Sequence, residues 1–450
     1  MGKLFGTDGI RGIANRELTP ELLLKIGRAS ALVLNKNNSR DRILIGRDPR
    51  LSGDLLEAAL IAGITSVGVD VLKVGIVPTP AVAYLTKKLG CSGGLMISAS
   101  HNPLRDNGIK LFDGAGFKLS DRCEDRIEKL AFKRKFPQPT AAGVGRVFSK
   151  PQAVQLYQNY LKTEVPLNLE GLRIALDCAH GSTSPYAPGL FEEMGAQVSP
   201  FFHEPNGFNI NEECGSTFPE KIQDLTRKVG AQVGFAFDGD GDRVIAVDEK
   251  GDLVDGDHIL AIIGLHLLHN DKLPARKIIA TPYSNGGLRE AFLASGGDVI
   301  LAPVGDRYVL QAMLEEGCVL GGEQSGHIVF LNNATTGDGL LTALKLLEVL
   351  TIKKEPLSKL AQSMATFPQR LINIPVRSGE DWLNNSRIQN SIAVAEKRMG
   401  SRGRLFIRPS GTEPILRILG EHPDGKVLEE ALGLVVEAIR LEQERTTYAN

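Results

Sequence analysis

The sequence predicts an α/β fold of several domains, and two observations carry that prediction. Short apolar runs such as "RILIG" (42–46) alternate with longer stretches such as "GDLLEAALIAGITSVG" from Gly53, whose apolar residues recur at helical spacing. Strands that are apolar throughout are typical of parallel sheets with helices on both faces. The chain has 450 residues, and since a domain averages roughly 150 residues, we expect about three or four domains.

The first domain shows the alternation most clearly. A strand at "VDVLKVG" (69–75) precedes a helix at "TPAVAYLTKKLG" (79–90), for which Thr79 is the expected N-cap and Pro80 lies in the first turn. The next strand, "GGLMIS" (93–98), leads directly into a polar loop. Open α/β sheets place their ligand sites at the carboxyl ends of strands, so this loop is a candidate site.

The same alternation divides the chain into four predicted domains. Three α/β domains are expected at 1–150, 151–254 and 255–366, and a last domain at 367–450 contains two strands and a final helix. The segment "RKFPQPTAAGVG" (134–145) before the first boundary is rich in proline and glycine, which suits a connector.

Composition and charge argue against two classes of partner. The chain carries 52 basic and 53 acidic side chains. This balance does not favour a nucleic-acid binder or a protein held on a membrane surface by basic residues. No apolar run reaches the roughly 18 residues that cross a bilayer, and the first residues lack the apolar core of a secretory signal. We therefore expect a cytoplasmic protein.

The segment "DGDGDR" (238–243) carries the strongest metal signal. Asp238, Asp240 and Asp242 are spaced by two, so in an extended segment their side chains would point to one side and converge. Such hard oxygen ligands suit Mg²⁺, which would also offset their mutual repulsion. A solvated acidic turn is the plain alternative, but the segment follows the apolar strand "VGFAFD", where a sheet should end.

A calcium-binding EF-hand is the sharper alternative, because a loop that begins at Asp238 would place Glu249 as the twelfth-position ligand. That loop needs glycine at its sixth position, where this chain has Arg243, and it needs helices on both sides, where strands are predicted. The EF-hand interpretation therefore fails.

Two further loops offer groups that bind sugars and phosphates. "RPSGTEP" (408–414) has a guanidinium, two hydroxyls and glycine-exposed amides, the donors that surround a phosphate, although a polar hairpin turn explains these residues about equally well. In "GGEQSGH" (321–327), Glu323 and Ser325 could bind sugar hydroxyls, and His327 could transfer protons near neutral pH. A lone histidine is more often structural.

The polar loop after the strand at 93–98 reads "MISASHNP" (96–103). Neither serine has the flanking glycines of the hydrolase motif G-x-S-x-G. A Ser-His-Asp triad is disfavoured because adjacent residues such as Ser100 and His101 seldom face one another, and Ser100 could simply cap a turn. With a metal loop and a phosphate loop elsewhere, a serine that carries a phosphoryl group is the better explanation.

Taken in order along the chain, these four motifs resemble those of the α-D-phosphohexomutase superfamily, and the resemblance covers nearly the whole chain. "GTDGIRG", "NINEECGST" and Gln324 are similar to the bacterial members that act on glucosamine phosphates. Relatives that act on glucose or mannose phosphates more often have Thr-Gly where this chain has Ser98 and Ala99. The resemblance implies three related α/β domains with mixed sheets, plus a smaller C-terminal α+β domain, around a central cleft.

The resemblance also implies roles for individual residues. It makes Ser100 the phosphoserine, whose phosphate would bind Mg²⁺ together with Asp238, Asp240 and Asp242. It places around the reacting oxygen Lys110, Arg11 and His327, and leaves open which of them takes the proton. The residues implied to bind the substrate are Arg243, Glu323, Ser325, Arg408, Ser410, Gly411 and Thr412.

The activity that the resemblance implies is the reversible conversion of glucosamine 6-phosphate to glucosamine 1-phosphate, which feeds UDP-N-acetylglucosamine and cell-wall synthesis. Glucosamine 1,6-bisphosphate, or glucose 1,6-bisphosphate, would be the intermediate or activator. The alternatives are the same mechanism on glucose or mannose phosphates, a Mg²⁺-dependent sugar phosphatase, and a binder of sugar phosphates without catalysis. We expect a monomer or homodimer.

Overall fold

The computed structural model describes residues 4–6, 8–35, 41–133, 135–376, 382–409 and 415–448. The chain divides into two compact units. The larger unit comprises Met1–Thr281 and Ile300–Ser363, and the smaller one comprises Pro282–Val299 and Met364–Asn450. The domain boundaries predicted from the sequence stay a prediction.

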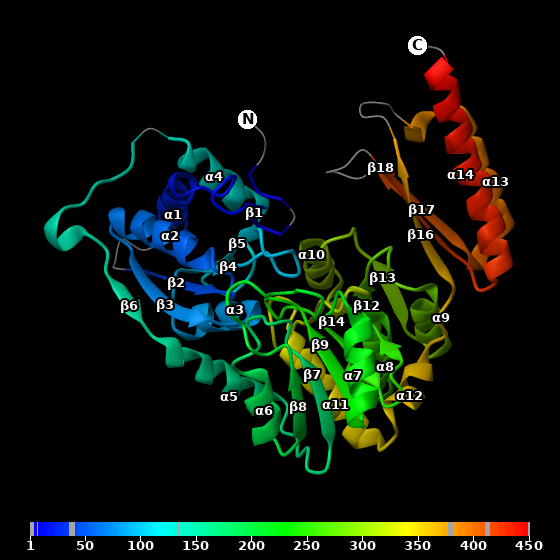
Figure 1. Cartoon of the computed structure of the whole chain (residues 1–450), viewed down its shortest axis with the longest axis horizontal. Helices are drawn as coiled ribbons and strands as arrows, with labels where there is room; N and C mark the ends of the chain where they lie inside the picture. Colours follow the sequence, from blue (N-terminus) through cyan, green and yellow to red (C-terminus); the bar gives the residue numbers. More distant parts are fainter. Residues whose placement is uncertain are drawn as a thin grey trace. The chain divides into compact units, whose positions relative to one another are not determined.

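The first sheet of the larger unit has six strands in the order β1-β5-β4-β2-β3-β6 (Figure 1). Their bounds are β1 Ile10–Ile13, β2 Arg42–Arg47, β3 Asp70–Ile76, β4 Gly93–Ile97, β5 Asp106–Asp113 and β6 Val147–Ser149. Strands β2, β3, β4 and β6 are parallel, whereas β5 is antiparallel to β4 and to β1. The sheet is therefore mixed, as predicted.

Helices cover both faces of this sheet. Their bounds are α1 Pro20–Leu34, α2 Gly53–Ser66, α3 Thr79–Lys88, α4 Asp121–Ala131 and α5 Val154–Glu164. Ile43 and Ile45 of β2 share a buried cluster with residues of α1, α2 and α4. On the opposite face, α3 packs closely against β4 because Gly94 has no side chain. A Cβ on Gly94 would lie 2.2 Å from Thr86 Oγ1. The alternation of side chains along the strands thus sorts the helices between the two faces.

One detail of α3 differs from the prediction. Thr79 is the first helical residue and Pro78 is the N-cap, so the expectation that Thr79 caps the helix was wrong. The Thr79 hydroxyl instead donates to Asp240 Oδ2 at 2.5 Å, a partner that lies 161 positions away in the sequence.

The second sheet has the order β11-β10-β9-β7-β8. Its strands and helices are β7 Arg173–Asp177, β8 Gln197–Phe201, β9 Val233–Phe237, β10 Val244–Asp248, β11 Leu253–Val254, α6 Ala187–Glu193 and α7 Pro219–Val229. Strands β7, β8 and β9 are parallel, and β10 returns antiparallel to β9. The connection between β9 and β10 is the segment "DGDGDR".

The third sheet has the order β13-β12-β14-β15. Its strands and neighbouring helices are β12 Lys277–Ala280, β13 Asp298–Leu301, β14 Leu320–Gly322, β15 Ile328–Phe330, α8 Gly256–His269, α10 Asp306–Glu316, α11 Gly339–Lys353 and α12 Leu357–Leu360. The antiparallel pair β14 and β15 is joined by the residues of "GGEQSGH".

The smaller unit contains an antiparallel sheet in the order β16-β18-β17. Its elements are β16 Gln369–Pro375, β17 Arg404–Pro409, β18 Ile415–Glu421, α9 Gly286–Ala294, α13 Ser386–Met399 and α14 Gly425–Tyr448. Apolar residues of β16, β18, α13 and α14 form its core. Glu421 ties α9 to this sheet, because its carboxylate accepts hydrogen bonds from Gly286 N and Arg404 Nε, both at 3.0 Å.

These sheets confirm the predicted fold class of mixed α/β layers followed by a smaller α+β part. Among the described residues, no helix combines the length and the apolar character that crossing a bilayer requires.

Candidate active site

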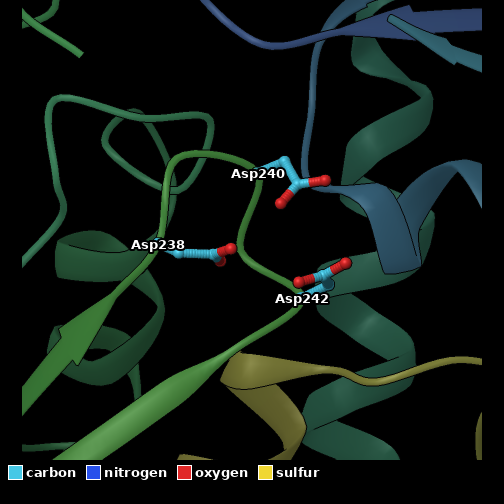
Figure 2. Close-up of side chains that lie close together, drawn as sticks. All are labelled: Asp238, Asp240 and Asp242. Atoms are coloured by element: carbon cyan, nitrogen blue, oxygen red, sulfur yellow. The ribbon is translucent and has the colours of Figure 1, made fainter. Parts of the chain in front are cut away.

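Three buried carboxylates lie on the turn between β9 and β10. Asp238, Asp240 and Asp242 each offer an oxygen, and these oxygens lie within 4.8 Å of one another (Figure 2). The spacing argument supposed an extended segment, but the segment forms a turn. Gly241 has a φ of 69°, and its N–H donates to the Asp238 carbonyl oxygen at 3.1 Å. The carboxylates converge because the turn is tight, with glycine supplying the left-handed backbone.

Lys110 on β5 supplies a counter-charge to this cluster. Its Nζ lies 2.8 Å from Asp240 Oδ2 and 2.7 Å from Asp242 Oδ2. Burial opposes the charge of Lys110, but the carboxylates of Asp240, Asp242 and Asp8 raise its pKa well above the usual value. Burial likewise opposes ionisation of Asp242, yet the charges of Lys110 and His327 lower its pKa well below the usual value.

Two oxygens of the cluster lack hydrogen bonds. Asp240 Oδ1 and Asp242 Oδ1 are buried and have no hydrogen-bond partner in the described part of the chain. Burial and the negative charges of Asp242 and Asp240 raise the pKa of Asp238 well above its usual value. A divalent cation with oxygen ligands would pair both oxygens and offset the repulsion. The donor set therefore fits a metal ion.

Ser100 faces this cluster from the loop after β4. Its Oγ donates to Asp238 Oδ2 at 2.6 Å, and its side chain is buried. The backbone is left-handed at this position, with a φ of 53°, which is uncommon for a residue with a Cβ. Ser98 supports the turn, because its Oγ accepts the Ser100 N–H at 2.9 Å.

His101 lies beside Ser100, which corrects the expectation that adjacent residues would not face one another. His101 Nδ1 is 3.2 Å from Ser100 Oγ, and the left-handed turn at Ser100 allows this approach. Burial, with the positive charges of Arg243 and Arg11, lowers the pKa of His101 to about 4. The imidazole is therefore neutral at neutral pH.

Asp8, Lys118 and Asp306 join this group although none was singled out from the sequence. Lys118 Nζ forms ion pairs with both Asp8 and Asp306, and Asp8 Oδ2 also pairs with Arg11 Nη2 at 2.5 Å. Burial opposes ionisation of Asp8, but the positive charges of Lys110, Lys118 and Arg11 lower its pKa well below the usual value. Only Asp8 lies in a motif that the resemblance used, "GTDGIRG".

A cavity of about 470 Å³ opens onto Asp8, Asp306 and Arg11. Its lining includes His101, Asp242, Arg243, Glu323 and His327. Burial opposes protonation of His327, yet the charges of Asp242 and Asp306 raise its pKa, and His327 Nδ1 lies 3.6 Å from Asp242 Oδ1. The cavity thus has carboxylate, guanidinium and imidazole groups on its walls, a set that offers hydrogen-bond donors and acceptors to a polar ligand.

The structure also describes two other predicted site residues, Ser325 and Arg408. Ser325 is exposed and does not line the cavity. Arg408 belongs to the smaller unit, where its Nε donates to Tyr283 Oη at 3.0 Å and its guanidinium lies 5.5 Å from the centre of that ring. Ser410, Gly411 and Thr412 lie outside the described residues.

Sequence models of four domain families match the chain in order. All four carry the description phosphoglucomutase/phosphomannomutase: alpha/beta/alpha domain I matches residues 2–138, domain II matches 155–251, domain III matches 255–367, and the C-terminal domain matches 371–438.

Curated relatives and solved structures agree with these matches. The chain is 50% identical over 441 residues to the phosphoglucosamine mutase of Carboxydothermus hydrogenoformans, which covers 98% of this chain and 99% of the relative. It is 48% identical to the phosphoglucosamine mutase of Bacillus cereus, with the same coverage. A phosphoglucomutase/phosphomannomutase family protein from Burkholderia thailandensis has a similar structure, with a TM-score of 0.83, 25% identity and 98% of each chain covered. The chain therefore belongs to the phosphoglucomutase/phosphomannomutase family and is an isomerase.

Proposed function

We propose that this chain interconverts glucosamine 6-phosphate and glucosamine 1-phosphate, and that Ser100 carries the transferred phosphoryl group. Relatives named phosphoglucosamine mutase are 48% and 50% identical to it over nearly the full chain, which supports the choice of sugar. The observation that carries the role of Ser100 is its Oγ, which lies 2.6 Å from Asp238 Oδ2 beside the buried carboxylate cluster.

The reaction balances as two reciprocal transfers. The bond between phosphorus and Ser100 Oγ breaks while a bond forms to the free hydroxyl oxygen of the sugar. The sugar hydroxyl gives its proton to a base, and Ser100 Oγ takes up a proton as it leaves. The product is a sugar 1,6-bisphosphate. After the sugar turns end for end, its other phosphoryl group returns to Ser100 and the hydroxyl regains a proton. The net change is the position of one phosphate.

Asp238, Asp240 and Asp242 are the proposed ligands of Mg²⁺, together with the phosphate on Ser100. When bound, Mg²⁺ would offset the charge of the phosphate and polarise it for transfer. In the protein itself, the orphaned oxygens of Asp240 and Asp242 support this assignment.

Lys110, His327 and Arg11 suit hydrogen-bond donation to phosphoryl and hydroxyl oxygens. The pKa values of Lys110 and His327 are raised by neighbouring carboxylates, after the opposing effect of burial. A raised pKa favours the protonated form of each group, which suits donation of a proton or a hydrogen bond. Arg11 lines the same cavity.

Substrate binding is proposed for residues of the cavity wall and of two loops. Arg243 and Glu323 line the cavity and would contact phosphate and sugar hydroxyls, with Ser325 at the adjacent exposed turn. The set proposed to hold the non-reacting phosphate is Arg408, Ser410, Gly411 and Thr412. Arginine suits this role because its planar guanidinium binds phosphate through two parallel hydrogen bonds.

Two measurements test the proposal. Intact-mass analysis should find a phosphoryl adduct that disappears in Ser100→Ala, since only a covalent carrier gains that mass. Steady-state kinetics should give a higher kcat/KM for glucosamine 6-phosphate than for glucose 6-phosphate or mannose 6-phosphate. A preference for either of the latter would transfer the assignment to a phosphoglucomutase or phosphomannomutase with the same mechanism.

Release of inorganic phosphate as fast as isomerisation would instead indicate a sugar phosphatase, in which water accepts the phosphoryl group.

The remaining parts of the proposal are a bisphosphate of glucosamine or glucose as intermediate or activator, a cytoplasmic location, and a monomer or homodimer that binds neither nucleic acid nor membranes. The product would supply UDP-N-acetylglucosamine synthesis.

A further inference from the structure

Arg50 lies under the loop that carries Ser100 and is fully buried, with 0% of its surface exposed. A guanidinium has five N–H donors in a rigid plane, and here each has an acceptor. Nε donates to Asp48 Oδ2 at 2.9 Å. Nη1 donates to the carbonyl oxygens of Pro103 and Asp106 at 2.6 and 3.0 Å. Nη2 donates to those of Ser100 and Asn102 at 3.0 and 2.7 Å.

The sheet explains why Arg50 reaches this loop. Strands β2 and β4 are parallel neighbours, and their last residues, Arg47 and Ile97, lie side by side. The residues that follow each strand therefore meet at the same edge. Asp48 accepts a hydrogen bond from Ser98 Oγ at 2.6 Å, and Arg50 lies beside this contact through its own bond to Asp48.

The four carbonyl bonds determine how the loop is turned. The Ser100 carbonyl points inward to Arg50, while the Ser100 hydroxyl points to Asp238. Asn211 adds a second donor to the same carbonyl, because its Nδ2 lies 2.8 Å from Ser100 O and 3.1 Å from Asn102 O. A left-handed backbone at a serine costs free energy and persists only where surrounding contacts compel it. These contacts come from Arg50, Ser98 and Asn211.

We propose that Arg50 is a positioning residue that holds Ser100 in the left-handed conformation required for phosphoryl transfer. The inference rests on the proposed role of Ser100. Because Arg50 is fully buried behind the loop, it does not touch substrate. Its loss should therefore lower kcat, which depends on the placement of Ser100 Oγ, and leave KM nearly unchanged. Lysine should not replace it, because an ammonium has three donors and no planar fork.

The test compares Arg50→Lys with Leu60→Ala in the full-length protein. Leu60 on α2 is fully buried in the core of the same sheet, and its truncation should lower the melting temperature without touching the loop. Both variants are assayed well below their melting temperatures. We expect Arg50→Lys to lower kcat about 100-fold, the cost of a displacement of roughly 1 Å, with KM unchanged. Leu60→Ala should keep the wild-type kcat per folded molecule.

If Arg50→Lys does not fold, Asn211→Gly decides the matter. Asn211 has a φ of 58°, a conformation that glycine adopts without strain, so this variant removes the side-chain amide alone. A lowered kcat with unchanged KM in Asn211→Gly supports the proposal that hydrogen bonds to the Ser100 carbonyl hold this residue in position. Wild-type kcat in whichever variant folds, or an altered KM with kcat intact, would overturn it. A wild-type protein that gains no phosphoryl group on Ser100 even with glucose 1,6-bisphosphate would overturn the proposed function instead, and mass analysis of the wild type separates the two failures.

Discussion

The loop of Ser100 and the loop of the three aspartates lie against each other, yet they are stabilised in opposite ways. In the Ser100 loop, Arg50 matches five donors to five acceptors. In the aspartate loop, Asp240 Oδ1 and Asp242 Oδ1 are buried without a hydrogen-bond partner among the described residues, and negative charges raise the pKa of Asp238 after the effect of burial.

The difference separates rigidity from binding capacity. A loop whose carbonyl oxygens are held by a buried guanidinium is restricted to one conformation. A buried loop in which carboxylate oxygens accept no hydrogen bond from the described residues retains a free-energy cost that a cation would lower. In the proposed function, the serine loop therefore supplies geometry, and the aspartate loop supplies affinity for a metal ion.

Ser100→Ala should give the largest effect, since it removes the proposed phosphoryl carrier from the rigid loop. We expect no measurable mutase activity and no phosphoryl adduct by intact mass. Stability should change by only about 1 kcal/mol, because one hydrogen bond to Asp238 is lost. Ser92→Ala removes a hydroxyl bonded to the Arg42 carbonyl and is the matched control with wild-type activity. Residual turnover in Ser100→Ala would show that another group carries the phosphoryl.

Asp238→Asn and Asp242→Asn should both lose more than about 100-fold in activity, since direct ligands matter more than their outer-shell partners. In EDTA, however, their melting temperatures should move in opposite directions. The raised pKa of folded Asp238 means that its contribution to stability is present below the unfolded pKa and is lost as pH rises through the folded one. Asparagine should therefore stabilise the protein at neutral pH.

Asp242 has the opposite sign. Its folded pKa is lowered, so its stabilising contribution is present above the unfolded pKa and is lost as pH falls through the folded one. Asp242→Asn should lower the free energy of unfolding at neutral pH by roughly 1–3 kcal/mol, and with it the melting temperature. The loss is smaller than for a fully broken buried ion pair because Lys110 still pairs with Asp240. Thermal unfolding of both variants in EDTA checks this, and equal shifts of one sign would refute the charge argument.

Lys110→Met removes the positive charge that pairs with Asp240 and Asp242, and it tests how far that charge stabilises the aspartate loop. Without its ammonium the aspartates repel more strongly, so we expect a loss of about 1–3 kcal/mol in EDTA. Added Mg²⁺ should recover part of it, because the cation replaces the missing positive charge. Lys73→Met, which breaks the ion pair with Glu57 at 2.8 Å, is the control that Mg²⁺ should not rescue.

Thr79→Val is expected to give the smallest effect. It removes the hydroxyl that donates to Asp240 Oδ2, and outer-shell partners of this kind change metal affinity by roughly 10-fold to 100-fold. We expect the lower end, measured as the Mg²⁺ concentration that gives half-maximal activity. Thr79→Ser keeps the hydroxyl and should behave as the wild type. If serine and valine weaken Mg²⁺ equally, the hydrogen bond is not the cause.

The short motifs were readable because their chemistry is local. Three aspartates within five positions place their negative charges close together whether the segment is a strand or a turn. The predicted convergence of the carboxylates was therefore confirmed although the extended conformation was wrong. The α/β class was readable for a similar reason, since the alternation of apolar runs and helical spacing repeats along the chain. The contact between His101 and Ser100 was not predicted because Ser100 has a left-handed backbone. A serine in the sequence does not indicate that conformation.

The contacts that complete the site could not be predicted, because they join residues far apart in sequence. Lys118 pairs with Asp306 across 188 positions, and Asn211 reaches Ser100 across 111. Arg50 lies in the segment "RDPRLS", whose residues are mostly of types common on protein surfaces. Nothing in that segment indicates a fully buried guanidinium.

By itself, the sequence determined the fold class, the family and the chemical types present at the site, because these depend on periodicity and on the identity of short motifs. Only the tertiary structure decided which oxygens remain unpaired, which cations neutralise which carboxylates, and what holds Ser100 in its turn. The physical reason is that pairing and desolvation are properties of neighbours in space. The parallel register of β2 and β4 brings Asp48 and Arg50 beneath the serine loop.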